Sequence, residues 1–162
     1  HSLAVVEGGR PIAGVVHLPM LERTYAAALR GGASMNGAAI AASSRADLAG
    51  AKVLATAALM EPSWWPGGVP KLDRHFRTSL AYRLCLVAEG KFDAMLTFRD
   101  TWEWDVAAGD LIAREAGARV TTRAGGATCY NAARPLLPGL VSCAPALHAA
   151  LVARLDGGMA PD

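Results

Sequence analysis

The stretch Thr101–Gly117 (TWEWDVAAGDLIAREAG) constrains the fold of this chain more than any other part of it. Its small and apolar residues recur at intervals of three and four, which is the spacing of one face of an α-helix. These residues are Trp104, Ala107, Ala108, Leu111, Ile112 and Ala116. Gly117 is typical of the position just beyond a helix C-terminus. The pattern predicts a helix whose apolar side packs against the protein, with Asp110 on the opposite, exposed side.

Asp105 falls in the first turn of this predicted helix. A carboxylate is favoured there because the first backbone N–H groups are unpaired and the N-terminal end of the helix dipole is positive. The same N–H groups can receive a phosphate, since Ala107, Ala108 and Gly109 leave the approach open. Asp105 is therefore either a helix cap or a metal-binding carboxylate beside a phosphate site.

Shorter apolar runs, separated by Gly, Pro and Asn-Gly turn signals, predict the other elements. Strands are expected at residues 2–6, 12–18, 24–29, 53–57, 75–77, 94–98, 119–122 and 140–143, and helices at 80–89 and 147–155. Strands that alternate with helices are typical of an α/β fold, with a mixed, mostly parallel sheet flanked by helices. The last residues, 156–162, are expected to fray.

Composition narrows the functional classes. Of the 162 residues, 52% are hydrophobic, which is enough for one domain with a core. The formal net charge is +2 and the basic residues are scattered, so we expect no surface for a nucleic-acid polymer. We find no apolar run of membrane-spanning length and no signal peptide, and therefore expect a cytoplasmic protein. Cys85, Cys129 and Cys143 are odd in number and predict free thiols, with Cys85 and Cys143 buried in apolar runs.

Other conspicuous side chains have structural explanations. Trp64 and Trp65 lie in a loop rich in Pro and Gly; at most one of them can face a binding surface, and an inward anchor is the more frequent role. His17, His75 and His148 share no ligand spacing, so we expect them on the surfaces of strands and helices.

Several segments have a residue order that resembles the signatures of a known protein family. The order W-D-x-A-A-G followed by L-I-x-x-E-A-G resembles the second signature of the inositol monophosphatase family of magnesium-dependent phosphatases. Residues 14–19 (GVVHLP) and 31–40 (GGASMNGAAI) resemble the same family in order and spacing. The resemblance implies that residues 1–155 are the C-terminal part of a layered α/β/α/β/α sandwich. It also implies that Asp105 is a Mg²⁺ ligand.

The same resemblance implies what a complete site needs. In the family, most metal ligands come from a glutamate pair and a D-P-[I/V]-D-G-T segment, and this sequence contains neither. Hydrolysis of a phosphate ester by magnesium requires several carboxylates that converge on one point. We therefore expect the catalytic residues in an N-terminal part that precedes His1, either removed or supplied as another chain.

Three residues are candidates for substrate binding. Thr78-Ser79 matches the Gly-Thr or Gly-Ser substrate loop of the family, although Ser79 can equally be a helix cap. Arg99 suits a phosphate that is not cleaved, because a guanidinium binds phosphate with two hydrogen bonds. Glu103 is expected either to bind a substrate hydroxyl or to be a solvated loop charge. The segment from Arg99 to Asp105 is most similar to the 3′(2′),5′-bisphosphate nucleotidase branch of the family.

These resemblances predict an enzyme that removes the 3′-phosphate from 3′-phosphoadenosine 5′-phosphate. An inositol-1-monophosphatase is the alternative within the enzyme class. A non-catalytic fragment, or a subunit completed by a partner chain, is the alternative of another class. The expected partners are a small phosphorylated substrate and either a second copy of the chain or the N-terminal segment, with no membrane.

Overall fold

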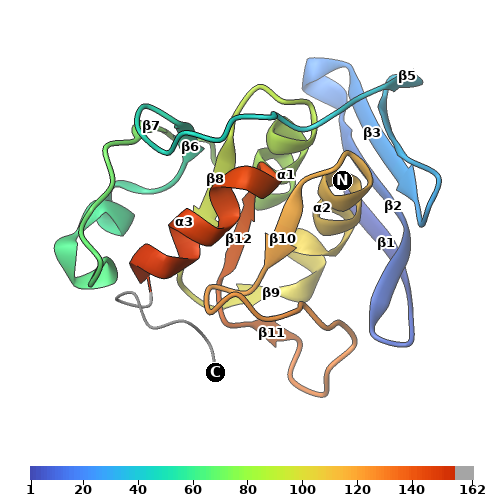
Figure 1. Ribbon diagram of the computed structural model, residues 1–162. Coiled ribbons are helices and arrows are strands. Elements are labelled where there is room, and N and C mark those ends of the chain that lie inside the picture. Colours follow the sequence, from blue (N-terminus) through green and yellow to red (C-terminus); the bar gives the residue numbers. More distant parts are fainter. Residues whose placement is uncertain (156–162) are drawn as a thin grey trace.

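The computed structural model describes residues 1–155, which form two five-stranded β-sheets, a two-stranded ladder and three α-helices (Figure 1). Sheet one has the strand order β1 (Ser2–Glu7), β2 (Arg10–Leu18), β3 (Arg23–Ala28), β4 (Ala33–Met35) and β5 (Ala38–Ala39). Sheet two has the order β10 (Arg119–Thr121), β12 (Leu140–Cys143), β8 (Ala94–Thr97), β6 (Lys52–Leu54) and β7 (Asp73–His75). Strands β9 (Thr101–Trp102) and β11 (Leu136–Leu137) form a separate ladder. The helices are α1 (Leu80–Ala88), α2 (Glu103–Glu115) and α3 (Pro145–Leu155), with 3₁₀ turns at Pro19–Leu21, Ala57–Met60 and Pro62–Trp64.

The elements stack in four layers, and α1 and α2 lie between the two sheets while α3 covers the far side of sheet two (Figure 1). One cluster of buried side chains joins sheet one, α1, α2 and sheet two, and a second joins sheet two to α3. This arrangement confirms the expected α/β layered fold. None of the helices in residues 1–155 is long and apolar enough to cross a membrane.

Sheet one is antiparallel throughout and is built from consecutive hairpins. The turn between β1 and β2 consists of Gly8 and Gly9, with φ of 54° and 77°. Two consecutive residues at positive φ form the tight turn that matches strand twist, and glycine adopts that conformation at no steric cost. The hairpin therefore forms where the sequence predicted it.

Strand directions in sheet two are more mixed than the expected mostly parallel sheet. The pairs β6–β7 and β6–β8 are parallel, whereas β12 is antiparallel to both β8 and β10. The crossover through α2 does leave β8 and β10 in the same direction. However, β12 enters between them from the opposite direction, after a long loop rather than a crossover helix, and so it pairs antiparallel with both.

Helix α2 spans most of the predicted stretch, but two of its side chains contradict the expected faces. Asp110 is fully buried rather than exposed. Trp104 is 58% exposed and stacks on Trp102, with ring centroids 4.7 Å apart. The reason is that α2 is covered by sheet one on one side and by α1 and the loop after β10 on others, so a single buried face does not describe it.

Among the other predictions about single side chains, those for the cysteines and Trp65 are confirmed and the one for His148 is wrong. Cys85 and Cys143 are buried free thiols, as expected, and burial raises the pKa of both. Trp65 is the inward anchor, since its Nε1 donates a hydrogen bond of 2.6 Å to the Leu59 carbonyl. His148 is not on the surface: it is buried and its Nε2 lies 2.8 Å from Thr121 Oγ1. The predicted tail, 156–162, lies outside the described residues.

Candidate functional site

A pocket of about 270 Å³ brings together three of the four predicted site residues. Ser79, Arg99 and Asp105 line it, although they come from three different segments of the chain. The other lining residues are His1, Ser2, Val16, Leu18, Thr78, Leu80 and Ala81. The pocket therefore lies where the start of α1, the start of α2 and the end of β8 meet.

Two helix N-termini open toward this pocket. Ser79 is the N-cap of α1, and its Oγ accepts a hydrogen bond of 3.2 Å from the Tyr82 N–H. Asp105 is the third residue of α2, whose N-cap is Trp102. Unpaired N–H groups and positive dipole ends favour an anion at such positions. The pocket thus has two sources of positive potential from the backbone alone.

The Asp105 carboxylate is exposed and makes no hydrogen bond or ion pair among residues 1–155. The capping interpretation is therefore wrong in its strict sense, because no side chain caps α2. A free carboxylate oxygen is a suitable ligand for a hard cation such as Mg²⁺. Residues 1–155 nevertheless contain no group of three or more His, Cys, Asp or Glu side chains able to hold a metal ion. Asp105 supplies one ligand, and this part of the chain does not fit a complete metal site.

Arg99 follows β8 and is exposed at the pocket, and its guanidinium makes no ion pair or hydrogen bond to the described part of the chain. Its guanidinium is therefore available to an anionic ligand. Together with Asp105 it gives the pocket one cation and one anion, which suits a ligand that combines phosphate and metal.

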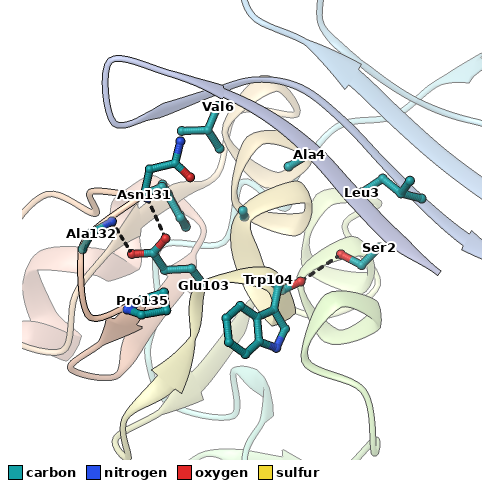
Figure 2. Close-up of a pocket in the computed structure, with 11 residues that line it drawn as sticks. Ser2, Leu3, Ala4, Val6, Glu103, Trp104, Asn131, Ala132 and Pro135 are labelled. Carbon is teal, nitrogen blue, oxygen red and sulfur yellow. Dashed lines mark hydrogen bonds between the residues drawn. The ribbon is translucent and has the colours of Figure 1, made fainter.

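Glu103 does not line this pocket. It is 7% exposed, and its carboxylate accepts hydrogen bonds from the Asn131 N–H at 2.6 Å and the Ala132 N–H at 3.2 Å (Figure 2). It faces a larger neighbouring pocket of about 620 Å³, which Trp104 and Pro135 also line. The expectation of a solvated loop charge is wrong, because the carboxylate is buried and each of its oxygens accepts one hydrogen bond from a backbone N–H. A bond from a substrate hydroxyl to Glu103 stays a prediction, since each carboxylate oxygen has a second acceptor site.

Sequence reasoning missed two residues near the site. Ser2 lines both pockets, and its Oγ lies 3.4 Å from the Trp104 carbonyl, but nothing in a strand sequence signals this. Arg83 is buried in α1 one turn after Ser79. A visible signal existed for Arg83, because it is the only charged residue in the run LAYRLCLVA.

Two curated phosphatases share about a third of their aligned residues with this chain. A "Fructose-1,6-bisphosphatase/inositol-1-monophosphatase" of Thermotoga maritima is 36% identical over 132 residues, covering 76% of this chain and 49% of the relative. A "3′(2′),5′-bisphosphate nucleotidase CysQ" of Salmonella typhimurium is 31% identical over 121 residues, covering 74% of this chain and 49% of the relative. The chain thus spans about half the length of these curated relatives.

The fold agrees with the sequence comparison. The solved structure of a Thermotoga maritima IMPase superposes with a TM-score of 0.79 at 27% identity, covering 96% of this chain and 59% of that one. The sequence profile of the inositol monophosphatase family matches residues 2–158. Because this match covers nearly the whole chain and the fold is shared, the chain belongs to the inositol monophosphatase family.

Proposed function

We propose that the complete protein is a Mg²⁺-dependent phosphomonoesterase and that the pocket of Ser79, Arg99 and Asp105 is part of its active site. The observation that carries the proposal is the convergence of two helix N-termini, one free carboxylate and one free guanidinium on a single pocket. Phosphate is favoured by the N–H groups and the guanidinium, and a divalent cation by the carboxylate.

Each residue has a separate task in this proposal. Asp105 holds the metal, Ser79 orients a phosphate oxygen with its hydroxyl, and the first N–H groups of α1 and α2 stabilise the phosphoryl charge. When bound, divalent metal ions provide an activated water and neutralise charge on the attacking and leaving oxygens. The remaining ligands belong to the part of the family's domain that carries the D-P-[I/V]-D-G-T segment.

We further propose that the substrate is 3′-phosphoadenosine 5′-phosphate, which loses its 3′-phosphate. Arg99 supports this choice, because an unpaired arginine at the pocket is suited to the second phosphate of a bisphosphate. Inositol 1-phosphate is the second candidate, supported by the 36% identity to the Thermotoga maritima relative. A subunit without activity of its own remains the alternative of another class.

The metal-ligand role of Asp105 is tested by Asp105→Asn in the complete protein. Asparagine keeps the size of the side chain but removes the negative charge that Mg²⁺ prefers, so phosphatase activity should be lost while the circular dichroism spectrum is unchanged. Asp100→Asn is the matched control, because Asp100 is an exposed carboxylate shortly before α2 that does not line the pocket. An active Asp105→Asn enzyme would contradict the assignment.

The substrate is tested by kcat/KM of the complete protein on 3′-phosphoadenosine 5′-phosphate and on inositol 1-phosphate. We expect the nucleotide to be preferred, and Arg99→Ala to narrow the preference by removing a charge-assisted contact. Equal values, or a preference for inositol 1-phosphate, would favour the second candidate. Absence of turnover on both, in a protein that contains all the carboxylates, would favour the subunit alternative.

A further inference from the structure

Gly109 is the only glycine in α2, and it packs directly against Leu84 of α1. A Cβ atom at position 109 would lie 2.7 Å from both the Cβ and the Cδ1 of Leu84. Both residues are buried. Carbon atoms in van der Waals contact are about 3.5 to 4.0 Å apart, so no side chain fits at position 109 while Leu84 stays in place.

The backbone of α2 does not require a glycine at this position. The φ angle of Gly109 is not in the positive range that favours glycine, and glycine in the interior of a helix is less stable than alanine. Gly109 also does not leave the helix start open to a phosphate, as the sequence suggested, because it is buried against α1. The missing side chain is therefore explained by the contact between the two helices.

This contact lies close behind the two helix starts that line the candidate pocket. Gly109 is one helical turn after Asp105, and Leu84 is one turn after Leu80, the first residue of α1. Asp105, Leu80 and the N-cap Ser79 all line the pocket of about 270 Å³. The separation of α1 and α2 at Gly109 and Leu84 therefore sets how far Asp105 lies from the start of α1.

A second close contact holds α2 on sheet one. A Cβ atom at Gly14 of β2 would lie 3.1 Å from the Ala108 Cα and 3.2 Å from the Ala108 carbonyl oxygen. Ala108 thus occupies the space that a side chain at position 14 would fill, which resists movement of α2 along the sheet. The strain of a side chain added at position 109 then falls on the contact between α1 and α2.

We propose that Gly109 is a positioning residue, whose contact with Leu84 sets the distance between the phosphate-binding start of α1 and the metal ligand Asp105 on α2. The inference rests on the proposed function and adds to it the residue pair that aligns the two helices. Alignment matters because a displacement of about 1 Å can lower a rate about a hundredfold.

The test is the coupling between Mg²⁺ and inorganic phosphate in the complete protein, measured by isothermal titration calorimetry in Mg²⁺ and in EDTA. The coupling is the factor by which Mg²⁺ lowers Kd for phosphate. In Gly109→Ala this factor should fall about fivefold or more, because the two binding groups are no longer aligned. Kd for phosphate in EDTA, which depends on the start of α1 and on Arg99, should change less than about twofold. The kcat for phosphate-ester hydrolysis should fall about tenfold or more.

Substitution of Leu84 separates this role from a structural one. In the Gly109→Ala background, Leu84→Gly should restore most of the coupling, because it removes both atoms that the new Cβ meets, while it lowers Tm further. Leu84→Ala removes only Cδ1 of the two and should restore less. Ile112→Ala is the control for lost stability. Ile112 is fully buried in the same helix, so its truncation should lower Tm and leave the coupling unchanged.

Unchanged coupling and kcat in Gly109→Ala would overturn the inference, whatever happens to Tm. A loss that neither substitution of Leu84 restores would overturn it as well, and so would an unsubstituted protein in which Mg²⁺ does not affect phosphate binding. If the complete protein hydrolyses no phosphate ester, but the coupling falls in Gly109→Ala and returns in the double variant, the proposed function fails and the positioning role stands.

Discussion

Asp110 is a charged side chain in the middle of α2 that no solvent reaches. It accepts hydrogen bonds from the Tyr130 hydroxyl at 2.5 Å, the Thr128 hydroxyl at 2.7 Å and the Arg114 Nε at 2.5 Å. A buried carboxylate is tolerated when its oxygens are paired in this way. Burial, followed by the charge of Asp110, raises the pKa of Tyr130, which keeps its hydroxyl protonated as a donor. Asp110 thus ties the loop after β10 to α2.

Tyr130→Phe removes one of these donors and leaves the ring in place. The free energy of unfolding of the complete protein should fall by about 1.5 to 3 kcal/mol, the range for a hydrogen bond to a charged group. Urea unfolding monitored by circular dichroism measures it. Tyr82→Phe is the control, since the Tyr82 hydroxyl makes no hydrogen bond in residues 1–155, and the two variants should differ. Equal stabilities would mean that the Tyr130 contact contributes nothing.

At the scale of one element, α2 is held at both ends by carboxylates that bind backbone N–H groups. Near the start, Glu103 accepts from Asn131 and Ala132, and its own N–H donates to the Pro135 carbonyl at 3.0 Å. At the end, Glu115 accepts from the N–H groups of Arg30 and Gly32 at 2.9 and 3.0 Å. Only the first set of contacts lies within two residues of Asp105, so it holds the turn of α2 that carries this carboxylate.

Glu103→Gln and Glu115→Gln are therefore a matched pair. Each replaces one accepting oxygen with an amide that faces a backbone N–H, and each should cost about 1 to 2 kcal/mol of stability in the complete protein. Glu103→Gln should in addition lower kcat and speed hydrogen exchange at Asn131 and Ala132, whereas Glu115→Gln should leave kcat unchanged. Identical kinetic effects in both variants would indicate a loss of stability alone.

Helix α2 also illustrates how much the sequence predicts. Periodicity located the helix, and the family signature drew attention to Asp105, because both are local patterns. The burial of Asp110 was not predictable, since its partners Thr128 and Tyr130 come from a loop about twenty residues later with no periodicity. The burial of Glu103 was not predictable for the same reason, because its partners are the backbone N–H groups of Asn131 and Ala132, which the sequence does not indicate.

In the candidate site too, residues within local motifs were predicted and a residue outside them was missed. Ser79, Arg99 and Asp105 were singled out from motifs, and the structure places all three on one pocket. Arg83 was missed because an arginine in an apolar run indicates burial but not what the charge faces. Most strands were located within a few residues, yet the position of β12 between β8 and β10 depends on how the whole chain closes.

At the scale of the whole molecule, sheet one is covered on one face only. Helix α2 packs on its inner face, whereas Leu3, Val5 and Val15 on β1 and β2 are 63%, 57% and 36% exposed. They line a shallow apolar depression that no described element covers. Strand β1 is also at the edge of the sheet, since among residues 1–155 it pairs only with β2. An exposed edge beside apolar surface promotes association between chains.

We therefore predict that the 162-residue chain alone self-associates and has no phosphatase turnover, because Asp105 by itself cannot displace the hydration of Mg²⁺. Sedimentation velocity and a phosphate-release assay measure the two properties. A second polypeptide that carries the family's D-P-[I/V]-D-G-T segment should restore both a discrete species and Mg²⁺-dependent hydrolysis.

The double substitution of Leu3→Gln and Val5→Thr separates the two effects. If the exposed face of sheet one causes the association, this variant of the isolated chain should sediment more slowly, because less apolar surface is offered to a second copy. It should remain inactive, since Asp105 still lacks the other carboxylates. A monomeric, unsubstituted chain that hydrolyses phosphate esters unaided would contradict both predictions. Its exposed apolar face would then not cause association, and its site would not require further metal ligands.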